Sequence, residues 1–263
     1  MHPMLNTAIK AARRAGTVII RALPDIDRLT IEIKGRHDFV SEVDRRSEEV
    51  IVETIRSAYP DHAILAEEGG ATAGNDWEWI IDPLDGTTNF LHGFPQFAVS
   101  IGLRCKGRLE QAVVFDPLRD ELFTASRGEG AQLNDRRIRV SRVAELDNAL
   151  LGTGFPFRQT DSVIQWVTMF RQFAQSTSGI RRAGSAALDL AYVACGRLDG
   201  FWETGLKPWD MAAGALLIRE AGGLTSDLFT EGDPLASGNI LAANPRIYSL
   251  MRHALSDLRV PDL

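Results

Sequence analysis

Residues 79–88 read Trp-Ile-Ile-Asp-Pro-Leu-Asp-Gly-Thr-Thr, an apolar run that ends in two carboxylates. The run predicts a buried strand, and Pro83 and Gly86 predict a sharp change of backbone direction at its end. Such a turn brings Asp82, Asp85 and an intervening carbonyl toward one point. Oxygen ligands of this kind suit a hard cation such as Mg²⁺, with positions left for water and a phosphate. For an isolated Asp-Gly pair, a plain hairpin turn stays the alternative.

Further acidic residues stand at the ends of other predicted elements. Glu67 and Glu68 follow the strand-like run 64–66, and Asp210 lies at the start of a predicted helix over residues 209–221. Taken singly, the Glu pair could be a solvated surface and Asp210 could complement a helix dipole. Their presence together with Asp82 and Asp85 favours a shared cation site.

The composition limits the classes of function. With 263 residues and 44% hydrophobic content the chain can bury a sizeable core. A net charge of −6 argues against direct nucleic-acid binding through bulk electrostatics, so a metal is the expected means of handling phosphate. Two distant cysteines give no disulfide framework, and charges interrupt every long apolar stretch, including the N-terminal one. We expect a soluble cytoplasmic protein without a membrane segment.

Periodicity predicts the order of elements. Helices are expected over 4–19 and from Ser41 to Pro60, followed by strands of an antiparallel meander at 63–65, 79–81, 97–103, 111–115 and 121–125. After about residue 145, helices are expected at 162–175, 185–195 and 209–221 and strands at 200–203, 223–227 and 239–243. The change of texture predicts two domains, 1–145 and 146–263. The five histidines show no metal-ligand spacing and the five tryptophans favour core packing.

Longer motifs resemble the inositol monophosphatase family, and the match covers nearly the whole chain. They are Glu67-Glu68-Gly69, residues 79–90 and Trp209-Asp210-Met211-Ala212-Ala213-Gly214. The match is closest to the bacterial SuhB type, through Lys34-Gly35, residues 38–44, Phe97-Ala98-Val99-Ser100-Ile101-Gly102 and residues 184–192. The resemblance implies an α+β and α/β fold, the layered αβαβα sandwich of the inositol monophosphatase and fructose-1,6-bisphosphatase type.

The resemblance also implies roles for individual residues. The magnesium ligands would be Glu67, Asp82, the Leu84 carbonyl, Asp85 and Asp210. Asp44 and Thr87 would orient the attacking water, with Glu67 also catalytic. The substrate would contact Gly86, Thr87, Thr88, Gly184, Ser185, Ala186, Glu203 and Asp210, and Lys34 is a further possible contact.

The implied activity is Mg²⁺-dependent, Li⁺-sensitive hydrolysis of inositol 1-phosphate by a homodimer. Relatives act on fructose 1,6-bisphosphate, histidinol phosphate, NADP or 3'-phosphoadenosine nucleotides, so the substrate stays open. SuhB-type proteins also join ribosomal RNA transcription complexes with RNA polymerase and Nus factors, and the basic pair Arg181-Arg182 could serve such a partner. A purely structural protein is the weakest alternative, since it has no reason to gather so many carboxylates.

Overall fold

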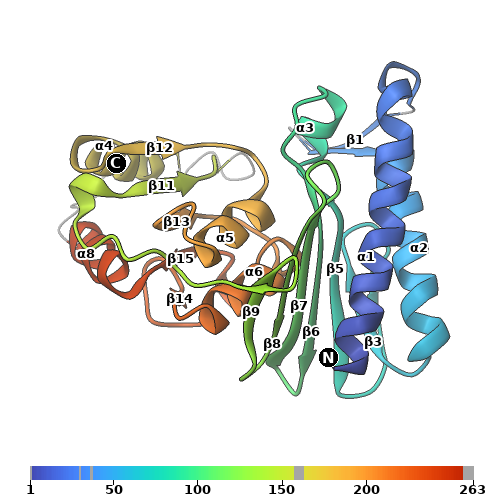
Figure 1. The fold of residues 1–263 in the computed structure, drawn as a ribbon. Helices are drawn as coiled ribbons and strands as arrows, with labels where there is room; N and C mark the ends of the chain where they lie inside the picture. The colour runs from blue at the N-terminus through green and yellow to red at the C-terminus, as the bar shows by residue number, and fades with distance from the viewer. Residues whose placement is uncertain (1, 30, 36–37, 157–162, 257–263) are drawn as a thin grey trace.

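The computed structural model describes residues 2–29, 31–35, 38–156 and 163–256 and arranges them in five layers (Figure 1). Two helices cover one face of a large sheet, two more lie between this sheet and a smaller one, and a third pair covers the far face of the smaller sheet. This is the αβαβα order that the family resemblance implied, and the fold class is confirmed.

The outer helices on the large sheet are α1 (Pro3–Ala22) and α2 (Glu42–Ala58), both as predicted. The Ser41 hydroxyl accepts a hydrogen bond from the Val43 amide, and the Asp44 carboxylate accepts one from the Ser41 amide at 2.8 Å. This capping box starts α2 and fixes the Asp44 side chain in its first turn. A 3-10 turn (Leu23–Arg28) and a hairpin of β1 (Ile31–Gly35) and β2 (Asp38–Ser41), which the sequence analysis missed, join the two helices.

Within the described residues the large sheet has eight strands in the order β10-β9-β8-β7-β6-β5-β3-β4. They are β3 (Ala63–Ala66), β4 (Gly70–Thr72), β5 (Trp77–Asp85), β6 (Ala98–Cys105), β7 (Arg108–Asp116), β8 (Glu121–Ser126), β9 (Gly130–Leu133) and β10 (Arg136–Arg137). β5 to β8 form the predicted antiparallel meander, and β9 and β10, which the sequence analysis missed, extend it.

β3 departs from the expected antiparallel sheet, because it pairs in parallel with β5. The chain turns back from β3 into the short β4 and then returns along the other edge of β3, so β5 runs in the direction of β3. The purely antiparallel prediction was therefore wrong at this edge. The parallel pairing places the ends of β3 and β5 side by side, and each end carries predicted metal ligands.

The smaller sheet has the order β12-β11-β13-β15-β14. Its strands are β11 (Leu150–Thr153), β12 (Gly179–Arg181), β13 (Gly200–Glu203), β14 (Leu224–Ser226) and β15 (Ile240–Ala243). The helices of this half are α4 (Val163–Ser176), α5 (Ala186–Ala194), α6 (Pro208–Glu220), α7 (Pro234–Ser237) and α8 (Pro245–Ser256), with a 3-10 turn at Leu146–Asn148. The sequence analysis missed β11, β12, α7 and α8, and the predicted start of α4 at Ser162 lies outside the described residues.

The central helices α5 and α6 are buried on nearly all sides, because a sheet covers each of their two faces. A Cβ on Gly214 would lie 2.5 Å from the Cβ of Leu190, so glycine permits the close approach of α6 to α5. One apolar core joins both sheets through these helices. The division into domains 1–145 and 146–263 stays a prediction, although the chain changes sheets between β10 and β11.

The aromatic residues agree with the core prediction where they are fully buried. Trp79 and Trp202 have no exposed surface. His62 is also buried, stacks on Tyr59 with ring centroids 4.7 Å apart, and accepts a hydrogen bond from the Trp79 indole at 3.1 Å. Among the described helices, none combines the length and hydropathy that a bilayer-spanning segment requires.

Candidate metal centre and catalytic pocket

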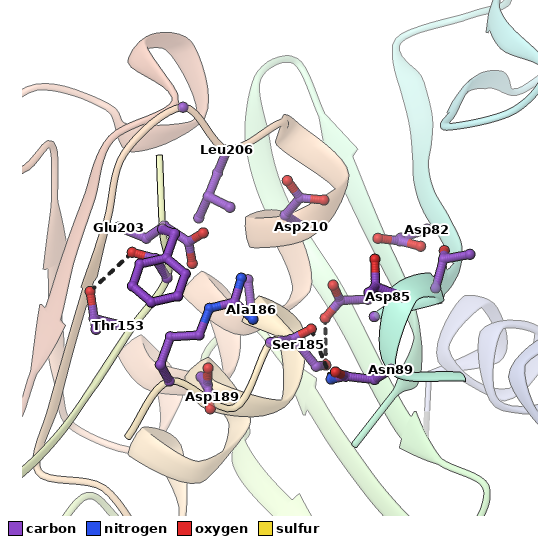
Figure 2. A pocket seen from close by; sticks show the side chains of 18 of the residues that line it. Asp82, Asp85, Asn89, Thr153, Ser185, Ala186, Asp189, Glu203, Leu206 and Asp210 are labelled. Atoms are coloured by element: carbon purple, nitrogen blue, oxygen red, sulfur yellow. Dashed lines mark hydrogen bonds between the residues drawn. The ribbon is translucent and has the colours of Figure 1, made fainter. Parts of the chain in front are cut away.

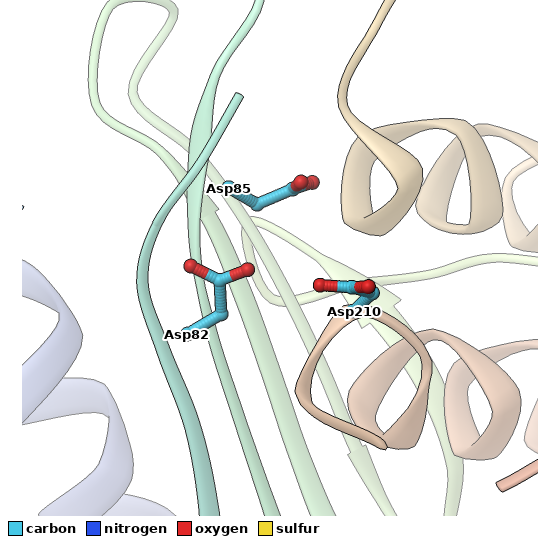
Figure 3. Close-up of side chains that lie close together, drawn as sticks. All are labelled: Asp82, Asp85 and Asp210. Atoms are coloured by element: carbon cyan, nitrogen blue, oxygen red, sulfur yellow. The ribbon is translucent and has the colours of Figure 1, made fainter. Parts of the chain in front are cut away.

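A bulge at the end of β5 brings two carboxylates to the same side of the sheet. Asp82 pairs with Ser100 and Asp85 pairs with Ala98, so β5 has one residue more than β6 across this interval. Residues three apart on a regular strand point to opposite faces, and an extra residue cancels that difference. Figure 3 shows the carboxylates of Asp82 and Asp85 on the side of the strand where Asp210 lies.

The third carboxylate, Asp210, comes from that first turn. Its Oδ2 accepts a hydrogen bond from the Lys207 amide at 2.7 Å, which caps α6 and fixes the side chain. Asp82, Asp85 and Asp210 each offer an oxygen, and these atoms lie within 4.8 Å of one another. The structure therefore brings Asp210 to two predicted ligands from which it is far apart in the sequence.

The loop before α5 holds Asp85 in this cluster. The Ser185 hydroxyl donates to Asp85 Oδ2 at 2.6 Å, and the Ala187 amide donates to the same atom at 2.8 Å (Figure 2). Both bonds involve Oδ2, and neither uses Oδ1. Ser185 was predicted as a substrate contact, and its hydroxyl is here engaged by a predicted metal ligand.

The cluster concentrates negative charge in a desolvated place. Burial, together with Glu67, Asp85 and Asp210, raises the pKa of Asp82 well above its ordinary range. Burial and the neighbouring Asp210 raise the pKa of Asp85 to about 7. Such a group of carboxylates is stabilised by a cation, and the purely oxygen donor set, with the Leu84 carbonyl beside it, fits Mg²⁺.

Glu67 lies at the edge of this group rather than within it, although it lines the same pocket. Its amide donates to the Ile81 carbonyl at 3.1 Å, which extends the parallel pairing of β3 and β5. Glu48 of α2 accepts from the amides of Glu68 at 2.8 Å and Gly69 at 2.6 Å. Glu48 thus anchors the turn after Glu67, a role that the sequence analysis missed.

Asp44 and Thr87 meet beside the cluster, as the resemblance implied. The Thr87 hydroxyl lies 2.8 Å from Asp44 Oδ1 and 3.1 Å from the Leu84 carbonyl oxygen, and both are acceptors. Asp44 is 1% exposed, and burial raises its pKa. Gly86, with φ of 91°, turns the chain into α3 (Thr87–Leu91), whose first amide groups have no acceptor within the helix.

A cavity of about 270 Å³ contains most of the predicted site residues. Its lining includes Glu67, Asp82, Leu84, Asp85, Gly86, Thr87, Thr88, Gly184, Ser185, Ala186, Glu203 and Asp210. In Figure 2, Asp82 and Asp85 lie at one end and Glu203 at the other. We call these the metal end and the alcohol end. Lys34 lies in β1, but its side chain falls outside what the structure describes.

The lining also includes residues that the sequence analysis did not select. Asn89 donates from Nδ2 to the carbonyls of Gln96, Ala183 and Gly184 at 2.7, 2.9 and 3.2 Å, and so joins α3 to the loop before α5. Asp189 and Arg182 lie near Glu203 at the alcohol end. Only the family motif around residues 184–192 could have drawn attention to this segment.

The model of the inositol monophosphatase family matches residues 1–259. The chain belongs to the inositol monophosphatase family. A Nus factor SuhB of Pseudomonas aeruginosa is 54% identical over 100% of this chain and 99% of that protein. The crystal structure of extragenic suppressor protein SuhB from Bartonella henselae superposes with a TM-score of 0.94 at 43% identity, covering 97% of this chain and 99% of that one. An inositol monophosphatase structure from Anabaena gives 0.88 at 42% identity, with 98% and 97% covered.

These comparisons confirm the resemblance to the inositol monophosphatase family and to its SuhB type. The layered fold is that of the solved family members. Membership supports a phosphatase, and the acidic cluster agrees with the family's use of a divalent cation.

Proposed function

We propose that this inositol monophosphatase family member is a Mg²⁺-dependent phosphomonoesterase that hydrolyses inositol 1-phosphate or a closely related small phosphate ester. The observation that carries the proposal is the cluster of Asp82, Asp85 and Asp210 beside the Asp44–Thr87 pair. A buried group of like charges is costly unless a cation neutralises it, and a phosphate ester is a ligand that such a cation would share.

The chain's own residues suit the handling of a nucleophilic water. Bound Mg²⁺ would stabilise charge on the phosphoryl oxygens and lower the pKa of a water molecule. The Thr87 hydroxyl has one hydrogen, which Asp44 or Leu84 accepts, so its lone pairs are available to accept a hydrogen bond from that water. Thr87 then orients the water, and Asp44 holds Thr87.

The rest of the pocket would bind the ester. The first amides of α3 have no acceptor within that helix, so they can donate to phosphate oxygens. Glu203 lies at the alcohol end, where it can accept hydrogen bonds from hydroxyl groups. Fructose 1,6-bisphosphate, histidinol phosphate, NADP and phosphoadenosine nucleotides are the alternative substrates.

Phosphate release by the purified chain tests this proposal. A panel of these esters, assayed with millimolar Mg²⁺ and with EDTA, should show Mg²⁺-dependent turnover that is highest for inositol 1-phosphate. Asp82→Asn should remove it, while the exposed control Asp147→Asn should retain it. Turnover that persists in EDTA, or in Asp82→Asn, would overturn the assignment. Inhibition by Li⁺ and a dimeric mass in solution are further expectations of this proposal.

A second role in transcription is favoured by the name of the Pseudomonas aeruginosa relative, a Nus factor. We propose that the chain also associates, in the cytoplasm, with an RNA polymerase and Nus-factor complex. Pull-down from cell extract with the wild type and with Asp82→Asn separates the two roles. Equal recovery of polymerase with the inactive variant would support independent functions, and no recovery with either would exclude the association.

A further inference from the structure

The alcohol end of the pocket holds two carboxylates rather than one. Glu203 ends β13, and Asp189 lies in the first turn of α5. Both line the cavity, and Figure 2 shows them at the end opposite Asp82. Asp189 is 2% exposed, so it is a buried acidic group that the hydrolytic chemistry at the metal end does not use.

Among the residues that the structure describes, neither carboxylate accepts a hydrogen bond. A buried carboxylate without donors costs free energy, and proteins keep such groups where a ligand supplies the donors. Asp82, Asp85 and Asp210 have the expected cation for this purpose. Asp189 and Glu203 lie beyond that cluster and have only Arg182 as a nearby positive charge within the described lining.

Arg182 does not neutralise the pair fully. It lies at the exposed mouth, with its guanidinium 4.7 Å from the centre of the Phe155 ring. It acts electrostatically on both Glu203 and Asp189, yet burial and the neighbouring carboxyl groups still raise the pKa of both well above the ordinary range. The alcohol end therefore has acceptors for hydroxyl hydrogens and opposes the entry of further negative charge.

The backbone around Glu203 is fitted to that carboxylate. A Cβ on Gly154 would lie 1.9 Å from Glu203 Oε1, so only glycine leaves room for the side chain as it stands. Gly152, two residues earlier in the chain, would place a Cβ 3.8 Å from Asp189 Cγ. The two glycines, one at the end of β11 and one just after it, thus keep side-chain atoms out of the space beside each acidic group.

We propose that Asp189 is a second specificity residue, which with Glu203 selects phosphate esters of neutral polyols and disfavours alcohols that carry another phosphate. The inference rests on the proposed function, since it assumes that the ester phosphate occupies the metal end. Hydroxyl groups would supply the missing donors to the two carboxylates. A second phosphate would add negative charge to a desolvated place that already disfavours the ionised form of both carboxyl groups, and like charges brought together there oppose binding.

The test compares three esters on the Mg²⁺-loaded full chain. p-Nitrophenyl phosphate has no hydroxyl groups and reports on the metal end, inositol 1-phosphate has a neutral polyol, and fructose 1,6-bisphosphate carries a second phosphate. Asp189→Asn should raise KM for inositol 1-phosphate and should raise kcat/KM for the bisphosphate relative to it by about tenfold. Turnover of the aryl ester should stay within about twofold, and Asp147→Asn, an exposed change of equal charge, should alter none of the ratios.

Gly154→Ala provides a second variant, because it displaces Glu203 without changing any charge. It should raise KM for inositol 1-phosphate and leave the turnover of the aryl ester within about twofold of wild type. An Asp189→Asn enzyme with unchanged ratios, or with equal loss for all three esters, would overturn the inference. Absence of turnover in the wild type would instead refute the proposed function. In that case the selectivity is tested by the change in melting temperature that each of the two sugar phosphates causes in wild type and in Asp189→Asn. Equal changes in both proteins would contradict the selectivity.

Discussion

Asp85→Asn should make the metal-free protein more stable at alkaline pH while it removes the response to Mg²⁺. The unfolded chain releases the Asp85 proton near pH 3.8, and the folded chain keeps it until about pH 7. Within this window the folded state binds more protons than the unfolded state, so stability falls as pH rises through it. Above about pH 7 the full penalty is present.

The magnitude follows from the shift in pKa. A difference of about 3 pH units corresponds to about 4 kcal/mol of destabilisation. Water in the open pocket screens part of this, which leaves about 2 kcal/mol. Asparagine removes the charge and keeps an oxygen to accept from Ser185 and Ala187, so the variant should gain this amount at pH 8. For a chain of this length the melting temperature should rise by about 4–8 °C.

Thermal melting at pH 5 and pH 8, with EDTA and with millimolar Mg²⁺, provides the assay. Wild type should gain stability from Mg²⁺ at pH 8, because the ion binds the folded state alone, and Asp85→Asn should gain much less. The gap between the metal-free proteins should shrink at pH 5, where wild-type Asp85 holds its proton. A metal-free variant that melts below wild type at pH 8, or that responds equally to Mg²⁺, would refute the role of Asp85 in the acidic cluster.

Three further changes test other contacts. Glu48→Ala removes the acceptor of the Gly69 amide, so Mg²⁺ affinity measured by calorimetry should fall about tenfold, with a smaller loss in Glu48→Gln. Equal affinities in wild type and variants would show that Glu48 does not support the metal site. Gly214→Ala forces α6 away from Leu190 and should cost about 1–3 kcal/mol in urea unfolding, whereas an unchanged midpoint would show that the interface is loose. Burial lowers the pKa of His62, so the free energy of unfolding should fall as pH drops below 6.5. His62→Gln should reduce this dependence of stability on pH, and an identical dependence in the variant would mean that another group titrates.

Local sequence signals predicted the elements whose formation depends on neighbours in the chain. The Ser41 capping box and the apolar stripe of α1 are encoded within a few residues, and both were predicted. The acidic ends of β3 and β5 were also recognised, because carboxylates after an apolar run are visible in the sequence. Family resemblance added the role of Asp210, which spacing alone could not assign.

Features that depend on long-range packing were not predictable in this way. The parallel pairing of β3 with β5 depends on which edge the chain returns to, and nothing local distinguishes the two edges. The bulge between Asp82 and Asp85 depends on the register of β6. Gly154 lies against the carboxyl group of Glu203, and the reason for a glycine at this position becomes apparent only when the two residues are in contact.

Asn89 restricts how a ligand can enter and leave. Its amide nitrogen has two hydrogens, which are shared among three carbonyl oxygens, one before β6 and two before α5. These hydrogen bonds connect the part of the molecule that contains the large sheet to the loop before α5, beside the pocket. Swinging the two halves of the molecule apart would rupture those bonds and pull Ser185 from Asp85. Substrate should therefore enter and product should leave through the mouth of the pocket, without a separation of the two halves. The side chains at the rim would then limit the rates of entry and release.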